Sequence, residues 1–389
     1  MDNSLLTAFP YIFFVAFIGL WGTFEFRYKR SERLARFLLT SYMFFFLFFL
    51  GLRGYVGYDF YNYYMEFWQP LPILGDKSFW GIFLGNDMVD IGFRFYMLVI
   101  KNIWNNYSFF VFINALIDWL FIAYFLKRYT KYISISFVIF MVMGGLIFEI
   151  DFIRNFKSIL LFVYSIKYIE KRRFLPFFLI NLLGCSFHIS ALLYIPFYFL
   201  ANRQINLRIY WCLFIGLNIL FICQIPFLKY ILLPLANMIG GVVLFMTERY
   251  FNEFSTSYGL SIGYIERVSV ALLCSYYYKN FTDNKLHLIN ANLLLYYLLL
   301  FFLFGEIRMV TLRLPYLFFF SYAVIIPLIY ELMHKKLHRQ IFLISIIIYS
   351  FLKIYGLTGL GMYQYENILF EHQTIEEREM QKKDIIIRH

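Results

Sequence analysis

The sequence predicts an all-α protein that crosses a membrane many times. Of its 389 residues, 61% are hydrophobic and only 15% are charged, whereas soluble globular domains average about 25% charged residues. Apolar windows of about 17 to 25 residues, each long enough to cross a bilayer as a helix, recur along the chain. The basic residues between these windows gather in alternate connections, as they do in multi-pass membrane proteins.

About twelve windows qualify as spans. They lie near residues 5–24, 34–52, 107–126, 132–150, 152–170, 174–200, 209–224, 230–247, 264–278, 288–304, 314–332 and 340–356. The first window lacks a preceding basic segment and a small-residue cleavage site, so we expect it to be retained as a span. Residues 1–370 are therefore predicted to form a single integral membrane domain, and residues 371–389 a charged, mobile tail.

The basic clusters also predict the orientation of the chain. They follow the odd-numbered windows, for example Lys171 to Arg173 and Lys335 to Arg339, and basic loops face the cytoplasm. The other connections mix acids with arginines, so we expect a functional site on the outer face. Because the net charge of +11 is dispersed among short loops, it does not indicate binding to nucleic acid.

The longest polar connection begins at Leu50. Residues 50–64 combine Arg53 and Asp59 with three glycines, which permit sharp turns and close approach of a ligand to the backbone. The alternative is an ordinary interfacial loop with a belt of tyrosines. Farther along this connection, apolar residues recur at a spacing of four between Ile91 and Trp104, which predicts an amphipathic helix along the outer interface. The members of this stripe are Ile91, Phe95, Val99 and Ile103.

His188 lies well inside a predicted window. At about 1.5 Å per residue, its distance from the start of window 174–200 places it roughly 21 Å along a core about 30 Å thick, in the outer half. Ionisable groups inside a membrane are costly and usually serve a function. The alternative is a neutral histidine that is hydrogen-bonded between helices.

Several arginines lie at the outer ends of windows. Arg154 starts window 152–170, and Arg308 and Arg313 flank the start of window 314–332. Guanidinium groups match phosphate oxygens in a two-pronged contact, so several at one membrane face predict a polyanionic ligand such as a lipid pyrophosphate. The alternatives are arginines that reach lipid headgroups and a local pair between Asp151 and Arg154.

The sequence predicts no cofactor. It lacks a phosphate-binding loop, a zinc-protease HExxH and a GxSxG in a suitable context. The acids Asp59, Asp151 and Glu306 could hold a divalent metal, although no ligand spacing predicts one.

Short motifs in a fixed order along most of the chain resemble a known family. They are Gly51-Leu-Arg53 followed by Gly57-Tyr-Asp59, Arg154 opening a span, Phe187-His188-Ile-Ser190, Arg313 before an aromatic-rich span, and Tyr365-Glu-Asn367. In this combination the chain resembles the EpsG/Wzy-type polysaccharide polymerases of bacterial envelopes. It departs from the family pattern at Tyr58, where a small residue such as threonine is usual, and at Lys157 and Ser158, near which an alanine is often found.

The resemblance implies a GT-C-like membrane glycosyltransferase on the outer face of the bacterial cytoplasmic membrane. Such an enzyme joins oligosaccharide repeat units carried on undecaprenyl diphosphate, and a protein that controls chain length is an expected partner. The reaction needs a base for the acceptor hydroxyl and cations for the departing diphosphate. Asp59 and His188 are the candidate bases, and the predicted diphosphate clamp is Arg53, Arg154, Arg308 and Arg313.

Three other functions are open on the sequence. A flippase for the same lipid-linked oligosaccharide would also need cations, but the two-fold repeat of spans that many transporters show is not evident. A ligase that passes finished polymer to another lipid would use nearly the same chemistry. A membrane O-acyltransferase would centre on a histidine reached from the cytoplasm, which the expected outer position of His188 disfavours.

Overall fold

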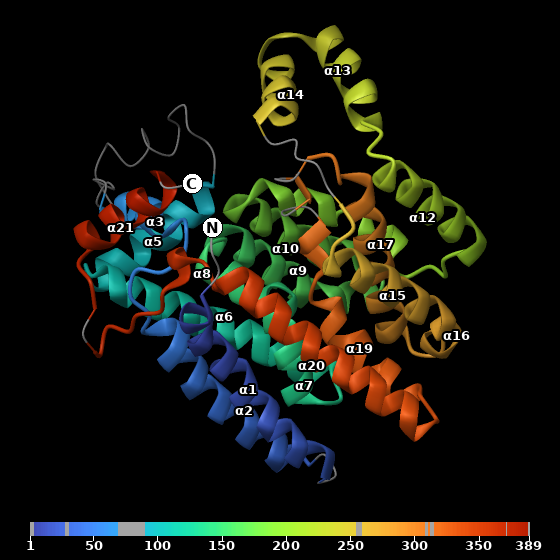
Figure 1. The fold of residues 1–389 in the computed structure, drawn as a ribbon, viewed down its shortest axis with the longest axis horizontal. Helices are drawn as coiled ribbons and strands as arrows, with labels where there is room; N and C mark the ends of the chain where they lie inside the picture. The colour runs from blue at the N-terminus through green and yellow to red at the C-terminus, as the bar shows by residue number, and fades with distance from the viewer. Residues whose placement is uncertain are drawn as a thin grey trace. The chain divides into compact units, whose positions relative to one another are not determined.

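The protein is almost entirely helical, as predicted (Figure 1). The structure is a computed structural model and describes residues 4–27, 31–68, 90–253, 259–307, 310–311, 315–370 and 372–387. The chain divides into two compact units, Met1–Pro196 with Met333–His389, and Phe197–Leu332. Each unit is built from the helices that lie within its own residues.

The first unit contains most of the residues predicted to act. Its helices are α1 (Leu5–Arg27), α2 (Glu32–Phe46), α3 (Phe60–Trp68), α5 (Ile91–Ile103), α6 (Tyr107–Tyr129), α7 (Ile133–Phe140), α8 (Leu146–Ile150), α9 (Ile153–Glu170), α10 (Phe174–Phe187), α20 (Lys336–Thr358) and α21 (Ile375–Ile387). Wider π-type turns over Leu47–Gly51 and Met141–Gly145 extend α2 and join α7 to α8.

The second unit is also helical. Its described helices are α11 (Phe197–Leu200), α12 (Leu207–Ile222), α13 (Phe227–Ile239), α14 (Gly241–Glu253), α15 (Ile262–Tyr276), α16 (Tyr278–Phe281), α17 (Lys285–Leu303) and α19 (Ser321–Leu332). Its polar contacts include Asn292 of α17, whose side-chain amide donates to the carbonyls of Ala201 and Arg203, both at 2.7 Å. These bonds fix the turn between α11 and α12 against α17.

Six described segments are long and apolar enough to cross a bilayer, which supports a multi-pass membrane protein. They are Leu5–Gly22, Glu32–Gly51, Tyr107–Tyr129, Ile133–Ile150, Lys285–Leu303 and Lys336–Thr358. A seventh results if α12 and α13, bent by 91° at their junction, form one broken span. Helix α12 ends just before Gln224, which adopts a left-handed φ of 52°, and Pro226 caps the start of α13, so the chain turns between the two helices.

Several of the twelve predicted windows correspond to helices that are shorter or more charged than a simple span. Window 152–170 is α9, which carries Arg154, Lys157, Lys167 and Glu170 within 18 residues. Window 174–200 is split into α10, a 3₁₀ helix (Ile189–Tyr194) and α11. Hydropathy alone does not distinguish a straight span from such interrupted segments.

Helix α9 is the centre of the first unit. It is buried along most of its length and packs against α6 and α10. A three-residue turn, in which Arg172 adopts a left-handed φ of 52°, connects α9 to α10, so the two form an antiparallel helical hairpin. The start of α9 and the end of α10 therefore lie at the same end of this hairpin.

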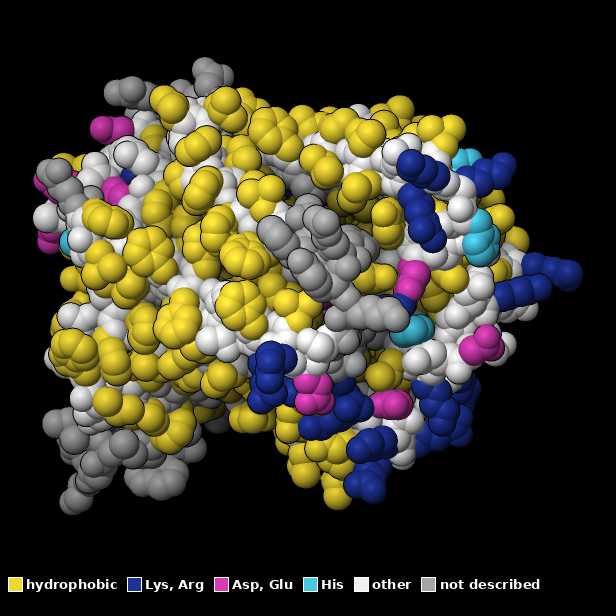
Figure 2. Space-filling view, turned by 90° about the horizontal axis from the view of Figure 1, so that it is seen from below, with side chains coloured by type: hydrophobic (Ala, Val, Ile, Leu, Met, Phe, Trp, Pro, Cys, Tyr) yellow, Lys and Arg dark blue, Asp and Glu magenta, His cyan; other side chains and the backbone are white. Residues whose placement is uncertain are grey.

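The predicted amphipathic helix is confirmed as α5. Its expected apolar stripe faces outward, with Phe95, Val99 and Ile103 exposed by 42%, 37% and 72%. A second set of apolar side chains on α5, which includes Phe93 and Met97, is buried against α3 and α6. Helix α5 thus offers one apolar face to the protein and another to the surroundings, as expected of a helix beside lipid. Hydrophobic side chains likewise cover much of the face shown in Figure 2.

The prediction of a mobile tail is wrong for residues 375–387, which form the docked helix α21. Arg378 of this helix is only 2% exposed, and its guanidinium donates to the carbonyls of Tyr55, Met362 and Gln364 at 2.9, 3.3 and 2.8 Å. Lys382 donates to the carbonyl of Tyr58. The segment docks despite its many charged residues because two of its cations bind backbone oxygens of other segments.

Replacement of Arg378 by alanine should destabilise the first unit by about 3 kcal/mol, because it leaves Glu366 and three carbonyls without their buried cation. Thermal unfolding in detergent and limited proteolysis of the C-terminus measure this effect. Lys383→Ala is the matched control, since the Lys383 side chain is 65% exposed. Equal stability of the two variants would contradict the docking of α21.

Candidate functional site

The polar connection after Leu50 is held against the C-terminal segment by backbone hydrogen bonds. Arg53 and Asn367 form an antiparallel bridge. On either side of it, the Ile368 N–H donates to the carbonyl of Leu52 and the Gly54 N–H to that of Glu366, both at 2.9 Å. Segments more than 300 residues apart in the chain therefore fix the backbone that leads to Asp59.

The carboxylate of Asp151 holds the next part of this connection. Its Oδ1 accepts hydrogen bonds from the backbone N–H groups of Tyr58 (2.7 Å) and Asp59 (3.3 Å), and its Oδ2 accepts one from the hydroxyl of Tyr363. Gly57 permits this approach, because it has a φ of +99° and a Cβ there would lie 2.1 Å from Oδ1. Burial raises the pKa of Asp151 to about 6, although the hydroxyl of Tyr363 opposes this.

Arg53 belongs to a buried ionic network. Its guanidinium donates to the carbonyls of Leu50 (2.6 Å) and Glu149 (2.9 Å) and lies 3.6 Å from the Glu149 carboxylate. The amide of Asn114 joins Glu149 to Asp118, and Asp118 pairs with Lys157 at 2.5 Å. Two cations thus balance two acids inside the helices, and these contacts give Arg53 and Lys157 structural roles. Diphosphate binding by Arg53 stays a prediction.

Arg154 is different, because its side chain is 36% exposed at the start of α9. Its Nη1 lies 2.8 Å from Asp90, and its guanidinium stands over the ring of Tyr63 at 5.6 Å. The alternative considered for Arg154, a local pair with Asp151, is not observed, because the Asp151 carboxylate accepts from Tyr58, Asp59 and Tyr363 instead. Burial raises the pKa of Asp90, and Arg154 opposes this shift. Asp90 was not among the predicted site residues. Its one signal in the sequence is its position directly before the amphipathic helix α5.

His188 lies where α10 ends. Its extended backbone (φ −160°, ψ 130°) breaks the predicted window at this point. The Nδ1 atom lies 2.7 Å from the hydroxyl of Ser190, and this hydroxyl lies 2.9 Å from the side-chain amide of Asn155 on α9. A chain of three side chains therefore links the end of α10 to the start of α9. Neither Ser190 nor Asn155 was among the predicted site residues.

The structure brings three of the predicted residues, Asp59, Arg154 and His188, to one end of the α9–α10 hairpin. Arg154 and Asn155 are consecutive in α9, so the side chains linked to His188 begin next to Arg154. Tyr63, under Arg154, donates its N–H to the carbonyl of Asp59 at 3.1 Å. The other two predicted arginines, Arg308 and Arg313, lie outside the described residues.

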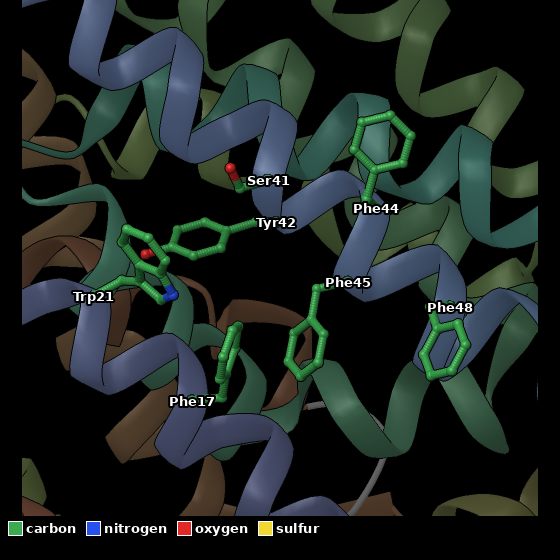
Figure 3. Close-up of a pocket in the computed structure, with 7 residues that line it drawn as sticks. All are labelled: Phe17, Trp21, Ser41, Tyr42, Phe44, Phe45 and Phe48. Carbon is green, nitrogen blue, oxygen red and sulfur yellow. The ribbon is translucent and has the colours of Figure 1, made fainter.

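A hollow of about 330 Å³ lies elsewhere in the first unit, between α1 and α2 (Figure 3). Its lining is aromatic apart from Ser41 and contains no charged side chain. It therefore cannot by itself bind a polyanion. Among the described residues, no group of three or more His, Cys, Asp or Glu side chains is placed to hold a metal ion.

The raised pKa of Asp151 predicts how stability depends on pH. The folded state keeps this proton up to about pH 6, whereas an ordinary aspartate loses it near 3.8. The free energy of unfolding should therefore fall by about 3 kcal/mol as the pH rises from about 4 to about 6, and then level off. Asp151→Asn, whose Oδ1 can still accept from Tyr58 and Asp59, should remove this fall in thermal unfolding scans. Glu376→Gln on the exposed side of α21 should retain it, and parallel curves for wild type and Asp151→Asn would contradict the assignment.

Gly57→Ala should be strongly destabilising. The added methyl group combines a left-handed φ with overlap on the Asp151 carboxylate, so we expect a loss of about 3 kcal/mol or more in unfolding free energy. Gly356→Ala provides the control, because nothing lies within 4 Å of a Cβ at that helical position. A Gly57→Ala protein as stable as the control would show that the connection adopts another conformation.

Comparison with known proteins places the chain in a family. The model of the EpsG family matches residues 36–367, most of the chain. This range includes Arg53, Asp59, Arg154 and His188 and ends before α21 begins. No curated protein and no solved structure matches the chain. The protein belongs to the EpsG family.

Proposed function

We propose that this protein is a membrane glycosyltransferase that joins oligosaccharide repeat units carried on undecaprenyl diphosphate. Its membership of the EpsG family is the observation that carries the proposal, because it implies a role in polysaccharide biosynthesis. The six or seven candidate spans support residence in a membrane. The proposal includes a site on the outer face of the bacterial cytoplasmic membrane, a GT-C-like fold of about twelve spans, and a partner that controls chain length.

The proposed reaction transfers the growing chain to the next unit. A hydroxyl oxygen of the incoming unit forms a bond to the anomeric carbon of the chain, and its proton passes to a base. The bond from that carbon to the diphosphate breaks, and its electron pair leaves with undecaprenyl diphosphate. Asp59 and His188 are the two candidate bases.

Arg154 is the described arginine best suited to the departing diphosphate. A guanidinium has five N–H donors, so the contact of its Nη1 with Asp90 leaves others for phosphate oxygens. The Asp90 contact and the Tyr63 ring also hold the group in a fixed direction, which favours two-pronged binding. Arg53, Arg308 and Arg313 stay predicted members of the clamp.

Arg154→Lys should shorten the polymer and lower its rate of formation by about tenfold or more, because lysine keeps the charge but lacks the planar fork. The assay uses purified protein in proteoliposomes with a lipid-linked repeat unit and measures the length distribution of the products. Arg173→Lys, at an exposed position of the turn between α9 and α10, should behave as wild type. A normal ladder from Arg154→Lys would contradict the diphosphate role.

The same assay separates polymerisation from the rival functions. A polymerase lengthens chains already present on one leaflet, whereas a flippase only moves the lipid-linked unit between leaflets. A ligase would transfer finished polymer to a different lipid acceptor. Wild-type ladders from both Asp59→Ala and His188→Ala would remove these residues from the mechanism.

A further inference from the structure

The aromatic hollow between α1 and α2 lies in a part of the protein that is suited to the interior of a membrane. Its two walls belong to the candidate spans Leu5–Gly22 and Glu32–Gly51. We propose that this hollow binds the polyisoprenoid chain of the lipid-linked substrate, in the part that follows the diphosphate. This inference rests on the proposed function, because that function supplies a substrate with such a chain.

The lining of the aromatic hollow is suited to an uncharged chain. Its volume of about 330 Å³ lies within the range of about 300 to 1,000 Å³ that is usual for ligand pockets. Ser41 is its one lining residue without a ring, and the hydroxyl of Tyr42 donates to Ser134 at 2.6 Å instead of serving the hollow. The remaining walls are rings from both helices (Figure 3), which are Phe17, Trp21, Tyr42, Phe44, Phe45 and Phe48.

The aromatic hollow is open on the outer side of α2. Phe44 and Phe48, which line it, are 65% and 43% exposed. The rings of Phe17 on α1 and Phe45 on α2 lie 4.6 Å apart and connect the two helices. The exposed side of a membrane span faces lipid tails, so an apolar chain that already lies in the bilayer enters this hollow without passing through water.

One end of the aromatic hollow adjoins the polar connection of the candidate site. Phe48 lies in the π-type turn that extends α2, five residues before Arg53. Its carbonyl accepts from the side-chain amide of Asn367 at 2.8 Å, and its ring meets that of Phe370 at 6.4 Å. Between these two residues, Ile368 lines a second, much smaller hollow that Arg53 also lines. The segment 367–370 therefore borders both the aromatic rings and the surroundings of Arg53, so a chain in the aromatic hollow begins near the predicted diphosphate site.

Two physical effects favour a polyisoprenoid over an ordinary lipid tail in this hollow. Transfer from the bilayer gains little from the hydrophobic effect, because lipid tails are themselves apolar. Binding must instead come from close contact with the rings, and the methyl branches and double bonds of a polyisoprenoid offer more such contact than a straight acyl chain. In addition, a diphosphate held at the connection keeps its own chain at a high local concentration beside the hollow. A phospholipid of the bilayer has neither advantage.

A cross-linking experiment tests the binding of the chain. The full-length protein in nanodiscs is irradiated with undecaprenyl phosphate that carries a diazirine near its phosphate, and the labelled peptides are identified by mass spectrometry. We expect labels on the peptides that contain Phe17 and Phe45, and a loss of these labels when unlabelled undecaprenyl phosphate is added. Ser41→Trp, whose ring fills the hollow, should lose most of them, whereas Ser345→Trp, at an exposed position of the candidate span α20, should keep them. A phosphatidylglycerol with the same diazirine in an acyl chain is the second probe. Equal labelling of the hollow by both probes would mean that it holds ordinary bilayer lipid, which would overturn the proposal.

A kinetic comparison tests what the chain site does for the reaction. The hollow contacts the chain equally before and during glycosyl transfer, so Ser41→Trp should raise KM for the lipid-linked unit about tenfold and leave kcat within about twofold. Ser41→Leu fills less of the hollow and should shift KM in the same direction by less, which keeps the test valid if the tryptophan variant folds poorly. Ser345→Trp should match wild type, and an unchanged KM in both Ser41 variants would contradict the proposal. If wild type makes no polymer but undecaprenyl phosphate still labels the hollow, the glycosyl-transfer proposal fails and the chain site stands.

Discussion

The arrangement at this end of the first unit depends on the buried carboxylate of Asp151. Burial of a carboxylate costs free energy, and here two backbone N–H groups and a tyrosine hydroxyl offset that cost. The same contacts tie together the connection that carries Asp59, the start of α9 and the segment around Tyr363. Without this acceptor, the N–H groups of Tyr58 and Asp59 would lose the partner that fixes the backbone of this connection.

Two groups of charges in the first unit have different surroundings. Arg53, Glu149, Asp118 and Lys157 are buried and neutralise one another, which is the arrangement expected where isolated ions are expensive. Arg154 lies at the start of α9, where it is partly exposed, and pairs with Asp90 at the start of α5. This difference in burial, rather than the identity of the residues, distinguishes an arginine that stabilises the helices from one that can meet a ligand.

Much of the fold could be predicted from the sequence, because the signals were local. Apolar windows predicted α1, α6, α17 and α20, and the spacing of apolar residues predicted α5. Contacts between distant segments were not accessible in this way. The sequence shows Arg378 as one charge in a polar stretch, and only the folded chain places it among the carbonyls of Tyr55 and Met362. Likewise, Arg154 has an acid three residues before it, yet its partner is Asp90, 64 residues away. The break at His188 was hidden for another reason, since apolar residues continue on both sides of it.

The position of α21 has a consequence for biosynthesis. Arg378 and Lys382 bind backbone carbonyls on either side of Gly57, although more than 320 residues separate them along the chain. The carbonyls of Tyr55 and Tyr58 can therefore acquire these cations only after the residues of α21 have been synthesised. The connection that carries Asp59 is made early but reaches its final geometry late, when a distant segment of the same chain docks on it.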